Sequence, residues 1–88
     1  MHERSLVNDL VHRVEAVATG AGVDSVLSVR VRLGALAHLS PEHLAGHFHT
    51  AAAGTLAEGA DLVVEQDDDI GAIDAMDLRL ISVDVAEG

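Results

Sequence analysis

One short segment of alternating apolar and polar residues limits the fold more than any other feature of the chain. It occupies residues 25–34, where four apolar residues are separated by three polar ones: Leu27-Ser28-Val29-Arg30-Val31-Arg32-Leu33. A period of two predicts a β-strand with one buried face and one solvent face. Such a strand belongs to a sheet that is covered by helices on a single side.

Segments of helical periodicity stand on both sides of this strand. The first covers residues 4–19, ends at a glycine-containing stretch with Gly20 expected as the left-handed cap, and repeats apolar residues at helical spacing: Leu6, Val7, Leu10, Val11, Val14, Val17 and Ala18. The second begins at Ser40-Pro41-Glu42, which predicts Ser40 as the N-cap and Pro41 as the first helical residue. Gly54 is expected to end it.

Two further strands are predicted at residues 60–65 and 78–85. The first of them places Leu62 and Val64 inward, and the second places Ile81, Val83 and Val85 on one face. The order α-β-α-β-β predicts an α+β fold, a two-layer domain with two helices packed on one face of a three-stranded sheet. A length of 88 residues fits a single domain, which we expect to span residues 1–88.

Composition excludes several classes of function. A formal net charge of −10 repels phosphate backbones, so we expect no nucleic-acid partner. The chain has neither an apolar run of the ~20 residues that cross a bilayer nor a basic and then apolar start, so we expect no membrane span and no signal peptide. The absence of cysteine excludes disulfides and thiolate zinc sites and is compatible with a cytoplasmic location.

The first three residues, Met1-His2-Glu3, carry the most distinctive set of metal ligands. The α-amine of Met1 and the imidazole of His2 are nitrogen donors, and the backbone amides of His2 and Glu3 lie beside them. Together these atoms can form five- and six-membered chelate rings around Ni(II) or Cu(II) in square-planar geometry. The predicted helix begins at the next residue, so this tripeptide would be attached to a packed element.

Other candidate sites are weaker. His43 and His47 are four residues apart on one helix face, but residues 44–46 supply no carboxylate to complete a zinc motif, and we expect solvated surface histidines. Asp67-Asp68-Asp69 lacks the glycine and closing glutamate of a calcium loop and is expected to be a solvated turn. No nucleophile turn or phosphate-binding glycine motif is present, so we expect no enzymatic activity.

Several segments, in this order, resemble the HypA/HybF family of nickel metallochaperones in hydrogenase maturation: Met1-His2-Glu3, residues 29–34, Leu39-Ser40-Pro41-Glu42 with Phe48, residues 54–60, and residues 78–85. The resemblance implies that Met1, His2 and Glu3 bind nickel. It also implies delivery of Ni(II) to a hydrogenase large subunit with the help of a nickel-handling GTPase. Some members of the family serve urease as well.

The chain departs from this family between its last two strands. The family carries two Cys-x-x-Cys pairs there, in a small zinc domain, whereas this chain has a short connection at about residues 67–77 and no cysteine. We therefore expect Ni(II) without zinc. A second interpretation is a zinc-less paralogue that acts as a protein-interaction module and binds no metal.

Overall fold

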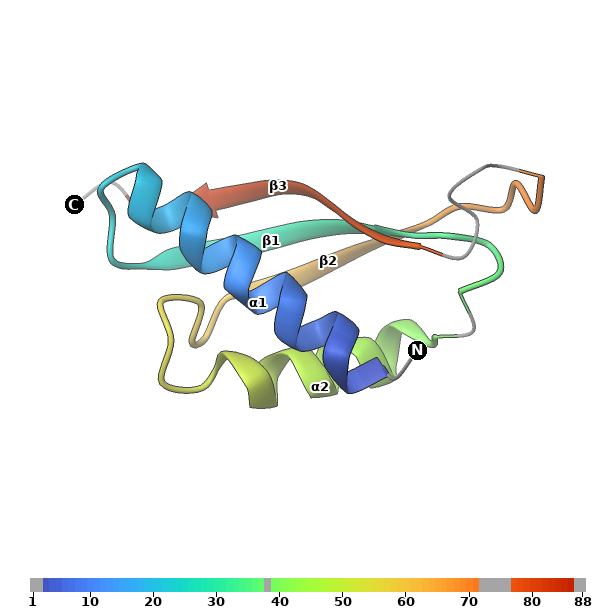
Figure 1. The fold of residues 1–88 in the computed structure, drawn as a ribbon, viewed down its shortest axis with the longest axis horizontal. Helices are drawn as coiled ribbons and strands as arrows, with labels where there is room; N and C mark the ends of the chain where they lie inside the picture. Colours follow the sequence, from blue (N-terminus) through green and yellow to red (C-terminus); the bar gives the residue numbers. More distant parts are fainter. Residues whose placement is uncertain (1–2, 38, 72–76, 87–88) are drawn as a thin grey trace.

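Two helices lie against one face of a three-stranded sheet, as the sequence predicts (Figure 1). The computed structural model describes residues 3–37, 39–71 and 77–86. Its elements, in chain order, are α1 (Glu3–Gly20), β1 (Val26–Leu33), α2 (Pro41–Ala52), β2 (Asp61–Gln66) and β3 (Leu78–Val85). The predicted α+β class and the order α-β-α-β-β are confirmed.

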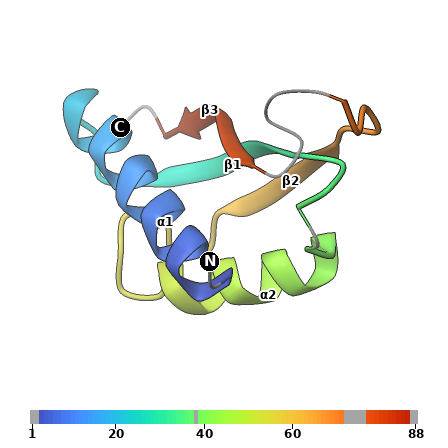
Figure 2. The ribbon, with the colours of Figure 1, turned by 45° about the vertical axis from the view of Figure 1, so that its right-hand side comes forward.

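The first strand is the central one, and the strand order is β2-β1-β3. β1 pairs with β2 in parallel, with Val29 opposite Leu62, and with β3 antiparallel, with Val29 opposite Val83. Parallel neighbours need a crossover connection, and α2 supplies it between β1 and β2. α1 lies on the same face of the sheet as α2, as Figure 2 shows from a second direction.

The core lies between the two helices and the inner face of β1. Phe48 and Leu44 of α2 and Val29 and Val31 of β1 have no exposed surface. α1 contributes the residues of one helical stripe: Val7, Leu10, Val11, Val14 and Ala18. Burial of these side chains is the main stabilising contribution available to a domain of this size.

The pairing of β1 with β3 contains two bulges, and they overturn two predicted orientations. Leu27 and Ile81 are each an extra residue on their own strand, because the register shifts between Val26 and Ser28 and again between Arg30 and Val31. Leu27 was expected on the buried face and is 58% exposed. Ile81 was expected to share a face with Val83 and Val85, but it is 47% exposed whereas those two pack against the core. An inserted residue reverses the alternation beyond it, so Val26 is buried in place of Leu27 and Leu80 packs against the core in place of Ile81.

The helix ends agree with the sequence in part. Ser40 is the N-cap of α2, since its Oγ accepts a hydrogen bond from the His43 amide at 3.1 Å, and Gly54 follows the helix with φ of 80°. For α1 the expected cap was wrong: the helix includes Gly20, and the left-handed residue is Gly22, with φ of 74°. The left-handed residue therefore comes two positions later than predicted. The Val23 amide, directly after it, donates a hydrogen bond to the Ala18 carbonyl at 3.1 Å and closes the turn.

One residue of the α1 stripe was also misplaced. Val17 is 46% exposed, whereas Ala18 beside it is fully buried. Successive residues are separated by about 100° around a helix, so Val17 falls at the edge of the arc that faces the core. In the ranges 3–37, 39–71 and 77–86, no helix combines the length and the apolar character needed to cross a membrane.

Both ends of the connection between β2 and β3 are hydrogen-bonded to two adjacent residues of the chain, Leu33 and Gly34. The Asp67 amide donates to the Leu33 carbonyl at 2.9 Å, and the Gly34 amide donates to the Asp77 carbonyl at 2.9 Å. Residues 72–76 of the expected connection lie outside the described residues. Both described ends are therefore held at the carboxyl end of β1.

Candidate metal-binding site

The predicted nickel ligands are the first three residues of the chain, and α1 begins at the third of them. Met1 and His2 lie outside the described residues, and Glu3 is described as the first residue of that helix. The α1 backbone gives this end of the chain a fixed base, since Val7, one turn further, is only 1% exposed. The part of the site that the structure describes is thus the surface next to the helix start.

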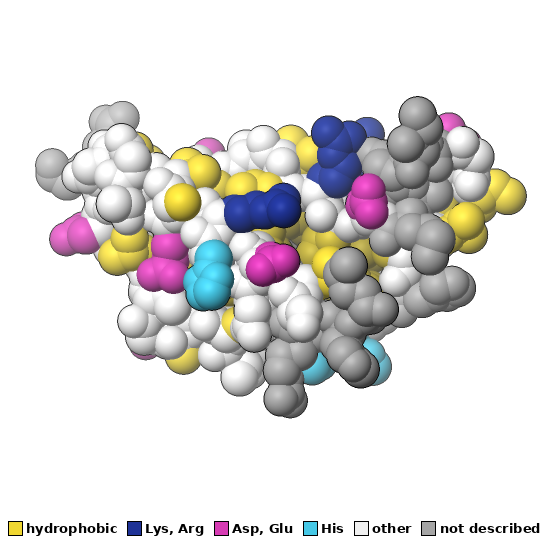
Figure 3. All heavy atoms as spheres, viewed as in Figure 1, with side chains coloured by type: hydrophobic (Ala, Val, Ile, Leu, Met, Phe, Trp, Pro, Cys, Tyr) yellow, Lys and Arg dark blue, Asp and Glu magenta, His cyan; other side chains and the backbone are white. Residues whose placement is uncertain are grey.

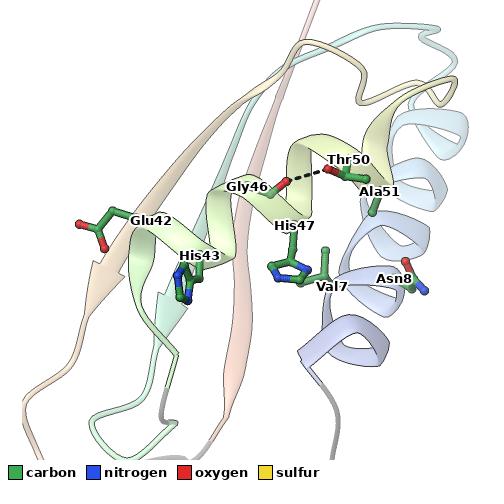
Figure 4. A pocket seen from close by; sticks show the side chains of 8 residues that line it. All are labelled: Val7, Asn8, Glu42, His43, Gly46, His47, Thr50 and Ala51. Atoms are coloured by element: carbon green, nitrogen blue, oxygen red, sulfur yellow. Dashed lines mark hydrogen bonds between the residues drawn. The ribbon is translucent and has the colours of Figure 1, made fainter.

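That surface is a groove of about 490 Å³ between α1 and α2 (Figure 4). One turn of α1 and most of the length of α2 form its walls. Its lining residues are Val7, Asn8, Glu42, His43, Gly46, His47, Thr50 and Ala51. Gly46 has no side chain to fill the groove. Apart from its own helix backbone and its chain neighbours, no atom lies within 4 Å of the position that a Cβ atom on Gly46 would occupy. The groove is therefore open where the first turns of α1 meet α2.

Two histidines of α2 line this groove from the same side. His43 and His47 are both exposed, and Figure 4 shows both imidazole rings on the side of α2 that faces the first turns of α1. The first turn of α2 is fixed by the Ser40 cap, and Leu44 between the two histidines is completely buried. The expectation that these are surface histidines is confirmed, and the structure adds that they share a groove.

The remaining histidine of α2 is placed differently. His49 does not line the groove, and its ring lies edge-on to Phe48, with ring centroids 6.1 Å apart and an interplanar angle of 74°. A single edge contact of this kind fits a packing role for the imidazole. His49 therefore provides a natural reference for an exposed histidine outside the groove.

The aspartate run at residues 67–69 forms a turn, as expected. The Asp67 carboxylate accepts a hydrogen bond from the Asp69 amide at 3.0 Å, and the Asp69 carboxylate accepts one from the Gly71 amide at 3.0 Å. Side chains that cap backbone amides two residues ahead are typical of Asx turns. Within the part of the chain that the structure describes, no three histidine or carboxylate side chains are grouped to hold a metal ion.

The open face of the sheet carries paired polar side chains. Arg30 Nη1 donates to Glu65 Oε2 at 2.7 Å, and Ser28 Oγ donates to Asp84 Oδ2 at 2.8 Å. Both pairs join β1 to a neighbouring strand, as is typical of polar side chains that are cross-strand neighbours on the solvent face of a sheet. On the helix side, acidic, basic and histidine side chains are interspersed (Figure 3), and no patch of a single sign dominates that view.

Comparison with known proteins identifies the family of the chain. Residues 1–71 match the family model described as hydrogenase/urease nickel incorporation, metallochaperone, hypA. The hydrogenase maturation factor HypA of Streptomyces avermitilis is 46% identical over 67 residues, which are 75% of this chain and 51% of that protein. The factor of the same name from Methanosarcina mazei is 40% identical over 65 residues, 74% of this chain and 47% of that protein.

Solved structures agree on the fold. The solution structure of the Ni metallochaperone HypA from Helicobacter pylori matches with a TM-score of 0.80 and 19% identity, covering 97% of each chain. A second solution structure of a HypA protein matches with a TM-score of 0.70 and 19% identity, over 98% of this chain and 97% of the other. The chain spans about half the length of the curated relatives it matches. Because the family model covers residues 1–71 of 88, this chain belongs to the HypA family.

Proposed function

We propose that this chain binds Ni(II) through Met1, His2 and Glu3 and passes it on during hydrogenase maturation, with urease as a second class of client. Met1 supplies its α-amine, His2 its imidazole and amide, and Glu3 its amide or carboxylate. Four nitrogen or oxygen donors in short chelate rings suit the square-planar preference of Ni(II). The protein is then a carrier of the metal, without a catalytic step of its own.

The match of residues 1–71 to a nickel-incorporation family carries this proposal. The matched range contains the tripeptide and the whole of α1, β1, α2 and β2. The helix that begins at Glu3 is packed along its length, so ligands at the tripeptide start from a backbone that is already ordered. An ordered start lowers the conformational entropy that metal binding must offset.

Partners follow from the same family membership. We propose a nickel-handling GTPase and a hydrogenase large subunit as partners, in the cytoplasm, where metal insertion would take place. The connection at residues 67–77 holds no cysteine, so this domain would work without a zinc module between β2 and β3. Contacts that a zinc module makes in other family members would then be absent or replaced.

A nickel titration of four proteins tests the proposal. The four are a chain that starts at Met1, the same chain with one residue added before Met1, His2→Ala, and His43→Ala combined with His47→Ala. We expect tight binding close to one Ni(II) per chain for the first and the last, and its loss in the other two. The bound complex should be yellow and diamagnetic, and acidification should weaken it because protons compete for the nitrogen ligands. Equal affinity in the extended protein would place the site elsewhere.

A second function is favoured by one observation, the short cysteine-free connection in place of a zinc module. A paralogue without that module could keep the fold as a protein-interaction domain and bind no metal. The same titration separates the two. No tight Ni(II) binding by the chain that starts at Met1, with an unchanged circular dichroism spectrum, would support the interaction domain.

A further inference from the structure

We infer that His43 and His47 form a second site for a divalent transition-metal ion, in the groove between α1 and α2. The two residues are separated by four positions on α2, and both line the groove. Both are exposed, and their rings lie on the same side of the helix (Figure 4). Residues with this spacing have Cβ atoms about 5–6 Å apart, which lets two imidazoles reach one ion.

The backbone that carries the pair is held on both sides. The Ser40 cap accepts a hydrogen bond from the amide of His43 itself, at 3.1 Å. Leu44 and Phe48, each next to one of the histidines, are fully buried. The two imidazoles are therefore presented from a rigid turn, and binding an ion costs mainly the side-chain freedom of the two rings.

The chemistry of imidazole fits this use. A ligating ring uses one nitrogen and can donate from the other, so an imidazole remains able to ligate an ion while its second nitrogen makes a hydrogen bond. Imidazole suits Zn(II), Cu(II) and Ni(II). Glu42 also borders the groove, but its carboxylate points away from the two rings (Figure 4), so the histidine pair supplies the protein ligands. A net charge of −10 on the chain also raises the local concentration of cations.

Two protein ligands leave coordination positions open. An ion held by His43 and His47 would keep water or accept ligands from another molecule, so it would exchange readily, unlike a structural four-ligand site. α1 begins at Glu3 and contributes Val7 and Asn8 to the groove. If the proposed chelate at Met1, His2 and Glu3 is also correct, an ion in the groove is bound near the start of α1 and is available for transfer to the chelate. That role rests on the proposed function, but binding by the histidine pair does not.

Zn(II) is the best probe, because it has no square-planar preference and does not need the N-terminal chelate. The protein is acetylated at its α-amine and titrated with Zn(II) by calorimetry, while proton and nitrogen signals of the histidine rings are followed by NMR. We expect one ion per chain, with the rings of His43 and His47 shifting together. Cu(II) should bind more tightly than Zn(II) or Ni(II).

Matched variants decide between this site and general surface coordination. His43→Ala and His47→Ala should each weaken Zn(II) binding about tenfold or more, because each removes one of two linked ligands. The control, His12→Ala with His49→Ala, removes two exposed histidines outside the groove and should leave the affinity unchanged. Equal losses in the control, or none in His43→Ala, would overturn the inference. Acetylation removes the proposed N-terminal site, so the two proposals fail independently.

Discussion

Replacing Phe48 by alanine tests how far one aromatic ring holds the two layers together. Phe48 is the largest fully buried side chain, has no exposed surface, and is the only aromatic residue of the 88. Phe→Ala substitutions in cores typically cost about 3–5 kcal/mol, from lost burial and the cavity left behind. A stability of about 0.05–0.15 kcal/mol per residue gives roughly 4–13 kcal/mol for this chain, so the change removes about a quarter of it or more.

The measurement is urea unfolding followed by circular dichroism at 222 nm, since the chain has no tryptophan or tyrosine to serve as a fluorescent probe. The control is Ile81→Ala, which removes an apolar side chain that the bulge leaves 47% exposed and should lower stability by only about 1 kcal/mol. A loss below about 1 kcal/mol for Phe48→Ala would refute the packing argument. A loss above about 2 kcal/mol for Ile81→Ala would instead show that Ile81 is buried, as strict alternation predicts.

Three further perturbations have defined outcomes. Ser40→Ala should cost about 1 kcal/mol, because the His43 amide loses its side-chain acceptor, and a urea midpoint measurement compared with Ser40→Gly would show it. A double-mutant cycle on Arg30 and Glu65 should give a coupling of only about 0.2–1 kcal/mol that shrinks in high salt, since the two side chains are 50% and 36% exposed. Thermal melts with and without a strong chelator should coincide, because the buried core is apolar; unfolding by the chelator would mean that a metal holds the fold.

The order of the elements and the cap of α2 could be predicted because each depends on local sequence. Ser40-Pro41-Glu42 combines an N-cap, a first-turn proline and an acidic residue, and all three favour a helix start whatever surrounds them. The alternation of β1 holds over Val29, Arg30, Val31, Arg32 and Leu33, because the second bulge places its extra residue on β3 and leaves β1 uninterrupted.

The two bulges could not be predicted, for a physical reason. Leu27 and Ile81 have the residue type and the spacing of buried positions, and nothing in their own segments marks them as extra. The insertion on β1 and the insertion on β3 compensate each other, so the register is recovered only when both strands are considered together. Pairwise information of this kind is absent from a single strand's pattern.

The candidate site also has features that the sequence predicts and features that depend on how the helices pack. The tripeptide Met1-His2-Glu3 is readable from sequence because its ligands are neighbours in the chain, and so is the spacing of His43 and His47. That the histidine pair faces the first turns of α1 depends on how the helices pack on the sheet, which spacing does not determine. Gly46, which opens the groove between the two histidines, carried no signal in the sequence beyond a weak helix propensity.

The hydrogen bonds at the carboxyl end of β1 hold both described ends of the segment between β2 and β3 at one place on the sheet. Asp67 and Asp77 are tied to the adjacent residues Leu33 and Gly34, so the two ends of the connection stay close whatever lies between them. The entropy of closing a loop grows only slowly with its length, by about 0.6 kcal/mol for each doubling. The groove between α1 and α2 shares no lining residue with this connection. The packing of the helix pair therefore does not involve this connection, and the proposed metal site at the start of α1 does not depend on its length.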